Sequence, residues 1–245
     1  MFTKADLKLV KSLGEKNLRH ANKLFVAEGS KSVTDLLASP LKVAKIFALQ
    51  AWINQQPAAF LKQTEVCQVT AKELEQMSSL KSTRELIGLF HLPEPQFQAK
   101  DMKGLILALD TLQDPGNLGT LIRLADWYGI QHILCSNQTV DCFNAKVIQS
   151  TMGSIGRVKL HYGDLADFIK ELQLPVFAAS MEGSPSRNYK FPSNMVLLLG
   201  NEGSGISEAL RAKVTQTISI EKRGEAESLN VAMAGAILID RYFGQ

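Results

Sequence analysis

Residues 105–129 decide the fold of this chain, and they read LILALDTLQDPGNLGTLIRLADWYG. The apolar run Leu105–Leu109 is typical of a short strand that is buried on both faces. Residues 114–117, DPGN, form a turn sequence, and Asn117 can cap the helix that follows. Gly129 can end that helix. One apolar helix face is expected from Leu118, Leu121, Ile122 and Ala125. The stretch therefore predicts a strand, a turn and a helix in succession.

The same alternation continues to the end of the chain. Buried strands are expected at Leu105–Leu109, His132–Cys135, Val158–His161, Val176–Ala179, Met195–Leu199 and Thr217–Ile220. Helices are expected at Leu118–Tyr128, Asn144–Thr151, Leu165–Leu172, Ser207–Val214 and Leu229–Tyr242. Strands that alternate with helices predict an α/β domain whose parallel sheet is covered on both faces.

A smaller α/β domain is expected before residue 91. Its elements are a basic helix at Asp6–Ala21, strands at Leu24–Ala27, Val43–Leu49, Glu65–Val69 and Ile87–Phe90, and helices at Lys31–Ala38 and Ala71–Met77. Pro93 and Pro95 then disfavour helix in a polar stretch, which favours a linker. We therefore expect a domain at residues 1–91, a linker at 92–103 and a second domain at 104–245.

Composition excludes several classes of protein. The chain has 245 residues, 45% of them apolar, which excludes disorder and low-complexity character. The longest apolar run, Val231–Ile239, is too short for a membrane span, and the N-terminus has no apolar signal region. Three cysteines without a C-x-x-C pair and four scattered histidines argue against disulfides and metal sites. We expect a cytoplasmic protein that binds no metal and no membrane.

The net charge of +3 hides an uneven distribution. Residues 1–100 carry 14 basic and 9 acidic side chains, a net of +5, and residues 101–245 carry 13 and 15, a net of −2. A cluster of cations attracts polyanions such as RNA. The candidate RNA-binding residues are Lys8, Lys11, Arg19 and Lys23. A solvated amphipathic helix explains the same pattern, and charge alone favours it.

Two further loops follow expected strands. Gly200–Ser207, GNEGSGIS, nearly matches a phosphate-binding loop, but Ile206 replaces the required lysine and Glu202 adds a negative charge. A neutral or cationic ligand therefore fits better than a phosphate. The third loop leads to Ser228, which can cap the last helix, where Ala232, Ala234, Gly235 and Ala236 make a small-residue face. Each loop also has a plain structural interpretation, as a turn or a cap.

In their order and spacing, these loops resemble the motifs of the SpoU (TrmH-like) RNA 2′-O-ribose methyltransferases of the SPOUT superfamily. Residues 105–243 carry the match, and residues 1–90, with KLFVAEG at Lys23–Gly29, resemble the family's small RNA-binding domain, similar to ribosomal protein L30e. The resemblance implies a deep trefoil knot in the C-terminal domain. It also implies S-adenosylmethionine as cofactor, and a homodimer whose active sites are completed near the subunit interface.

The resemblance also implies roles for particular residues. The catalytic set would be Asn117, Arg123, Glu202, Ser228 and Asn230, and the cofactor would lie against Leu199, Gly200, Ile218, Ile220 and Leu229. In the family, the residue matching Arg123 activates the ribose 2′-hydroxyl and is often described as a base. Because arginine has a pKa above ~12, a role in binding the neighbouring phosphate and stabilising the 2′-alkoxide is chemically safer.

Two positions depart from the family pattern. Ser219 stands where the family usually has proline, which predicts a less rigid loop, and Gln149 stands where a basic residue is common. Neither position belongs to the catalytic set. The sequence thus predicts a methyltransferase that acts on a ribose 2′-hydroxyl of structured RNA, ribosomal rather than transfer RNA. The alternative is an RNA-binding or ribosome-assembly protein with a vestigial cofactor pocket.

Overall fold

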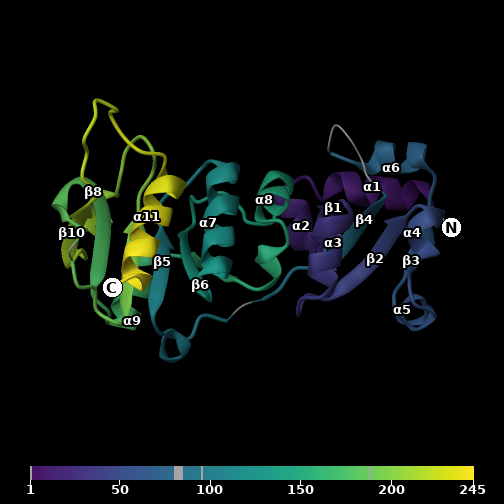
Figure 1. Ribbon diagram of the computed structural model, residues 1–245. Coiled ribbons are helices and arrows are strands. Elements are labelled where there is room, and N and C mark those ends of the chain that lie inside the picture. Colours follow the sequence, from purple (N-terminus) through teal and green to yellow (C-terminus); the bar gives the residue numbers. More distant parts are fainter. Residues whose placement is uncertain (1, 80–84, 95, 188) are drawn as a thin grey trace. The chain divides into compact units, whose positions relative to one another are not determined.

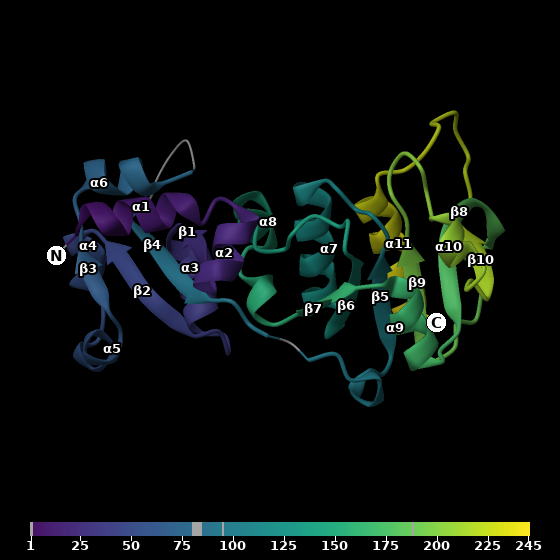
Figure 2. The ribbon, with the colours of Figure 1, turned by 180° about the vertical axis from the view of Figure 1, so that it is seen from behind.

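A computed structural model describes residues 2–79, 85–94, 96–187 and 189–245. Its contacts divide the chain into two compact units (Figures 1 and 2). We call residues 1–94 with Asp141–Arg157 the four-stranded unit, and residues 95–140 with 158–245 the six-stranded unit, after the sheet that each contains.

The six-stranded unit is built on a sheet in the order β10-β8-β9-β5-β6-β7, in which every pairing is parallel. Its strands are β5 (Leu105–Leu109), β6 (His132–Ser136), β7 (Lys159–Gly163), β8 (Val176–Pro185), β9 (Met195–Leu199) and β10 (Gln216–Ser219). Its helices are α7 (Pro115–Trp127), α9 (Leu165–Leu172), α10 (Glu208–Arg211) and α11 (Val231–Phe243), with a 3₁₀ turn η1 at Ala99–Asp101. The predicted parallel α/β sheet is confirmed.

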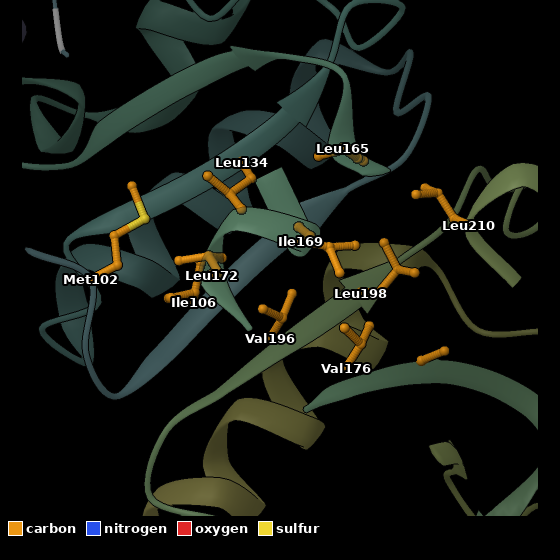
Figure 3. Close-up of a cluster of buried hydrophobic side chains, with 12 residues drawn as sticks. Met102, Ile106, Leu134, Leu165, Ile169, Leu172, Val176, Val196, Leu198 and Leu210 are labelled. Carbon is orange, nitrogen blue, oxygen red and sulfur yellow. The ribbon is translucent and has the colours of Figure 1, made fainter. Parts of the chain in front are cut away.

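Helices cover both faces of this sheet, as Figures 1 and 2 show from opposite sides. Alternate side chains of the central strands, including Ile106 and Leu198, pack with Ile169 and Leu172 of α9 (Figure 3). On the other face, α11 packs closely against α7 and β9. A Cβ added at Gly235 would lie only 2.7 Å from Leu121 and 3.2 Å from Leu199, so the absence of a side chain at Gly235 permits this packing. Truncating a buried leucine of such a core to alanine costs about 2–5 kcal/mol.

The four-stranded unit has a mixed sheet in the order β1-β4-β2-β3. Its strands are β1 (Leu24–Glu28), β2 (Val43–Ala48), β3 (Val66–Gln68) and β4 (Leu86–His91). Its helices are α1 (Lys4–Ser12), α2 (Lys16–Asn22), α3 (Ser30–Leu37), α4 (Gln50–Ile53), α5 (Ala58–Gln63), α6 (Ala71–Met77) and α8 (Ala145–Thr151), with a 3₁₀ turn η2 at Ser154–Gly156. No sequence pattern predicted α4 and α5, which are short.

The single basic helix predicted at Asp6–Ala21 is wrong, because the segment forms α1 and α2 with a break after Ser12. Leu13 is buried at the break. The Nη1 atom of Arg19 donates hydrogen bonds to the carbonyls of Leu13 and Gly14, at 2.9 and 2.8 Å. A continuous helix would give those carbonyls to backbone amides four residues further on.

Packing also divides the chain differently from the predicted boundaries. Residues 141–157 were expected in the C-terminal domain, but they pack in the four-stranded unit, where the ring of Phe143 lies 4.7 Å from that of Phe25. The predicted linker is ordered from Phe97 onward, with Phe97 against Phe168 at 4.5 Å and Met102 in the core. Pro95, on which the linker prediction partly rests, lies outside the described residues.

Across the described ranges, no helix is long and apolar enough to cross a membrane.

Candidate functional site at the carboxyl edge of the parallel sheet

Three side chains from the three predicted loops meet beyond the sheet. The Nδ2 atom of Asn117 donates to Oε1 of Glu202 at 2.7 Å, and Nδ2 of Asn230 donates to Oδ1 of Asn117 at 2.9 Å. These residues are 85 and 113 positions apart in the sequence. Ligands of open parallel sheets bind outside the carboxyl ends of the strands, which is where this amide–carboxylate chain lies.

The helix caps differ from the plain structural interpretations. Helix α7 begins at Pro115, and its cap is Asp114, whose carboxylate accepts from the Asn117 backbone amide at 2.7 Å. The cap of α11 is Asn230 rather than Ser228, and its Oδ1 accepts from the amides of Ala232 and Met233. Because Asp114 caps α7, the carboxamide of Asn117 is available to bridge Glu202 and Asn230.

Arg123 lies six residues beyond Asn117, about 9 Å further along α7 at a rise of 1.5 Å per residue. Its side chain is exposed, and within the described part of the chain the guanidinium has no hydrogen-bond or ion-pair partner. Ser228 is also exposed and makes no hydrogen bond to the three bridged side chains. The structure thus joins three of the five predicted catalytic residues and leaves Arg123 and Ser228 unengaged.

A cavity of about 850 Å³ opens beside this network. Its lining includes all five residues predicted to hold the cofactor, Leu199, Gly200, Ile218, Ile220 and Leu229, together with Glu202 and Ser228. The sequence did not predict the wall at residues 178–182, which the middle of β8 contributes. The signal was weak, because β8 runs on from an apolar run into the polar sequence MEGSP.

The loop between β9 and α10 closes tightly on itself. A Cβ at Gly200 would lie 2.4 Å from the carbonyl carbon of Gly205, and Gly205 has a φ of +69°. Asn201 and Gly205 exchange backbone hydrogen bonds of 2.9 Å in both directions. Gly200 is therefore required by the close approach of the backbone, and Gly205 is favoured by its left-handed conformation.

Ser219, where the family usually has proline, is tied to β8 on two sides. Its hydroxyl donates to the Gly183 carbonyl at 2.8 Å, and its own carbonyl accepts from the amide and hydroxyl of Ser186, at 3.0 and 2.6 Å. Side-chain hydrogen bonds therefore fix this turn of the chain, in contrast with the predicted loss of rigidity.

Carboxylates surround the cavity, among them Glu182, Glu202, Glu221 and Glu227, together with the cations Arg211, Lys222 and Arg223. A hydrogen bond from its own backbone amide lowers the pKa of the Glu221 carboxyl, and although desolvation opposes the shift, Arg241 lowers it further. Glu221 therefore stays ionised at neutral pH. Arg241 pairs with Glu221 at 2.9 Å, and among the described lining residues three cations offset the four carboxylates. The preference for a neutral or cationic ligand, which the sequence predicts from Glu202, therefore stays a prediction.

The predicted RNA-binding residues fare differently from one another. Lys8 and Lys11 are exposed, and Lys23 is exposed and pairs with Glu94 at 2.9 Å. Arg19 is only 2% exposed, and its Nε and Nη2 atoms bind Asp141 at 3.1 and 2.5 Å. The prediction for Arg19 is therefore wrong, because the folding of α2 onto residues 13, 14 and 141 consumes its donors.

Two of the histidines that are scattered in the sequence meet in the core. Nδ1 of His132 and Nε2 of His161 lie 3.1 Å apart on neighbouring strands. Over the described ranges, no group of three or more His, Cys, Asp or Glu side chains is arranged to hold a metal ion.

The fold and site define an α/β protein of the parallel-sheet class, with a ligand cavity beyond the strand ends and exposed polar side chains at its mouth. The chain belongs to the SpoU rRNA methylase family, whose model matches residues 104–240. A second model, of an MRM3-like substrate binding domain, matches residues 4–88. The predicted resemblance is confirmed.

Relatives match along most of the chain. The 23S rRNA (guanosine(2553)-2′-O)-methyltransferase RlmP of Bacillus subtilis is 29% identical, over 94% of this chain and 92% of the relative. The 23S rRNA (guanosine-2′-O-)-methyltransferase RlmB of Acinetobacter baylyi is 26% identical, over 86% and 93%. An AdoMet-bound rRNA methyltransferase from Sinorhizobium meliloti has a TM-score of 0.88 at 28% identity, over 99% of this chain and 95% of that one.

Proposed function

We propose that this protein transfers a methyl group from S-adenosylmethionine to a ribose 2′-hydroxyl of ribosomal RNA. The observation that carries the proposal is the meeting of Asn117, Glu202 and Asn230 at the mouth of the cavity that Leu199, Gly200, Ile218, Ile220 and Leu229 line. Family membership supports the reaction class, and the rRNA 2′-O-methyltransferases RlmP and RlmB support the substrate.

The cavity fits S-adenosylmethionine in size and in its apolar surface. Its volume of about 850 Å³ suits a nucleoside-sized ligand. The backbone around Gly200 would approach the ligand closely, and Leu229, which is 52% exposed, offers an apolar surface. When bound, this cofactor supplies an activated methyl group on a sulfonium.

The residues of the chain divide the remaining work. Arg123 is free to bind the phosphate beside the target ribose and to stabilise the negative charge on the 2′-oxygen as its proton passes to solvent water. Asn117, Glu202 and Asn230 form one rigid amide–carboxylate unit that orients the ribose, and Ser228 adds a hydroxyl at the cavity wall. Much of the rate enhancement then comes from positioning, which can replace several kcal/mol of activation free energy.

The domain assignment remains a proposal. Residues 1–91 would form the L30e-like RNA-binding domain, 92–103 the linker and 104–245 the methyltransferase domain. The two family models, which match residues 4–88 and 104–240, support these bounds. We also propose a deep trefoil knot within 104–245, a proposal that rests on the family resemblance.

We also propose a cytoplasmic homodimer formed through α7 and α11. Large apolar side chains are exposed on these helices: Trp127 at 84%, Met233 at 62% and Phe243 at 47%. Tyr128 and Phe243 stack at 5.2 Å, and the Tyr128 hydroxyl binds Asp240, so the two helices present one surface. An apolar surface of this kind marks a protein interface, and a second copy of the chain supplies its complement.

The test compares RNA from cells with and without the gene. We expect one ribose 2′-O-methyl group to disappear from ribosomal RNA when the gene is deleted, and the purified protein to restore it with S-adenosylmethionine. If the methyl group disappears from transfer RNA instead, the substrate is transfer RNA and the proposed ribosomal RNA substrate is wrong.

The alternative function is an RNA-binding or ribosome-assembly protein whose pocket is vestigial. Calorimetry separates it from the enzyme. A purified protein that binds ribosomal RNA but shows no heat of binding with S-adenosylmethionine would support the alternative and overturn the proposed reaction.

A further inference from the structure

Asp110 is a buried acidic residue that the proposed reaction does not use. It directly follows β5 and is 4% exposed. Its Oδ2 atom accepts from the Ser207 amide at 2.8 Å, and Oδ1 accepts from the Thr111 hydroxyl at 3.1 Å. A buried carboxylate is costly unless hydrogen-bonded. The bond to Ser207 holds the far end of the Gly200–Ser207 loop on the end of β5.

Asn201 fixes the near end of the same loop. Its Oδ1 atom accepts from the amides of Gly203 and Ser204, at 2.9 and 3.1 Å, and so wraps the backbone around Glu202. Its Nδ2 atom donates to the carbonyl of Thr111 at 2.8 Å. One carboxamide therefore shapes the turn that carries Glu202 and attaches it to the end of β5.

The attachment point itself is conformationally unusual. Thr111 has a φ of +57°, which is rare and costly for a β-branched residue. Its amide donates to the Ser136 hydroxyl at 2.8 Å, and its carbonyl receives Asn201. Such strain persists only where the surroundings hold it, and it concentrates at functional sites.

We propose that Asp110 and Asn201 are positioning residues, which anchor the Gly200–Ser207 loop so that Glu202 meets Asn117 and, through it, Asn230. The inference rests on the proposed function for the consequence in catalysis. The anchoring can also be measured without catalysis, through hydrogen exchange of two backbone amides. Asp110 accepts from the Ser207 amide, and Asn201 accepts from the Gly203 amide.

Isosteric variants separate the two halves of Asn201. Asn201→Asp keeps an acceptor for the Gly203 and Ser204 amides but loses the donor to Thr111, whereas Asn201→Ala loses both. Asp110→Asn keeps an acceptor for Ser207, whereas Asp110→Ala does not. We expect Asn201→Asp to slow single-turnover methylation about tenfold, the effect of one lost hydrogen bond to a fixed group. Asp110→Asn should rescue most of the loss seen in Asp110→Ala.

A double-mutant cycle with Glu202→Gln tests whether Asn201 acts through Glu202. Ribosomal RNA from a strain lacking the gene and radiolabelled S-adenosylmethionine serve as substrates, and Glu208→Gln, at the exposed start of α10, is the matched control. If Asn201 positions Glu202, the double variant is no slower than the slower single variant. Rate effects that multiply would overturn the proposal.

Amide hydrogen exchange gives the readout that is independent of activity. We expect faster exchange at Ser207 in Asp110→Ala and at Gly203 in Asn201→Ala, with β9 unchanged. Unchanged exchange at both amides would overturn the anchoring even if Asp110→Ala is too unstable to assay for turnover. A wild-type protein that transfers no methyl group would instead refute the proposed function, and the exchange result would still decide the anchoring.

Discussion

The two units of the chain place charged and polar side chains in opposite situations. In the four-stranded unit, Arg19 is buried, and Asp141 and two backbone carbonyls accept from its guanidinium. In the six-stranded unit, half-buried Asn117 is hydrogen-bonded to exposed Glu202 and Asn230. Arg123 is exposed and has no partner among the described residues.

The difference separates structural from functional charge. A guanidinium whose donors are used inside the protein stabilises the fold and has none left for a phosphate. A guanidinium held on a rigid helix beside an ordered polar network keeps its donors for a substrate. We therefore expect Arg19 to contribute to stability and Arg123 to catalysis, and the following predictions test both expectations.

The largest effect is expected from Arg19→Ala. The substitution leaves Asp141, whose side chain is 10% exposed, without its cation, and breaking a buried ion pair costs about 3–5 kcal/mol. Chemical denaturation should show this loss in the free energy of unfolding. Lys23→Ala is the matched control, because the exposed Lys23–Glu94 pair is worth about 0–1 kcal/mol. Equal losses in the two variants would break the comparison.

Arg123→Ala should act on rate rather than stability. We expect single-turnover methylation to fall about 10²–10³-fold, as for loss of one group that stabilises a developing oxyanion. The melting temperature and the affinity for S-adenosylmethionine, measured by calorimetry, should stay unchanged. Lys170→Ala, an exposed cation on α9, controls for charge. Full turnover in Arg123→Ala would show that its exposure has no catalytic meaning.

Acid should destabilise the six-stranded unit before the four-stranded one. Burial, with the charges of His132 and Lys159, lowers the pKa of His161 from 6.5 to about 4. Between pH 6.5 and 4, this histidine is protonated in the unfolded chain but neutral in the folded chain. The free energy of unfolding therefore decreases as the pH is lowered through this range, by up to about 3 kcal/mol. Hydrogen exchange resolved by unit measures the loss. His161→Phe should reduce it and leave the part due to His132, whose pKa burial also lowers.

In the four-stranded unit, the carboxyl group of Asp6 has a lower pKa than His161 has in the other unit. Burial opposes ionisation of Asp6, but hydrogen bonds from Lys45 and Thr3 outweigh it and lower the pKa of the carboxyl below 3.8. The stability that Asp6 contributes is present above that pH and is lost only as the pH falls below it. A loss of protection in this unit near pH 6 would contradict the order of events.

The smallest effect concerns the exposed lysines of α1. If Lys8 and Lys11 contact RNA phosphates, the double variant Lys8→Glu, Lys11→Glu should bind ribosomal RNA more weakly, with a salt slope reduced by about 1 per lost contact. Filter binding at several salt concentrations measures the slope. An unchanged slope would identify α1 as a solvated helix and leave the four-stranded unit with no tested RNA contact.

The sequence predicts the central elements of the fold closely. The predicted ranges of β5, β9 and α9 coincide with those observed, because continuous apolar runs and strong amphipathic periodicity determine them. The start of α7 was placed three residues late, since DPGN is a turn sequence and also a good first helical turn after an Asp cap. Local patterns could not predict that residues 141–157 pack with the N-terminal unit, because that depends on tertiary contacts.

Much of the cavity lining could be predicted from the sequence, but the hydrogen bonds between the polar side chains could not. The five predicted cofactor residues all line the cavity, because strand ends in a parallel sheet converge. The bridge from Asn230 through Asn117 to Glu202 needs the register of three distant loops, which no local pattern contains. Asp110 was missed for a similar reason, since nothing in the sequence indicates that an acidic residue after a strand is buried.

The packing of residues 141–157 has a consequence for biosynthesis. A ribosome that has made the first 94 residues has not yet made Asp141 or Phe143, the partners of Arg19 and Phe25. The four-stranded unit therefore completes its fold only after β5 and β6 of the six-stranded unit have been translated. No single cut in the chain separates the two units, so a fragment ending at the proline-rich stretch would carry an uncovered aromatic ring and an unpaired buried arginine.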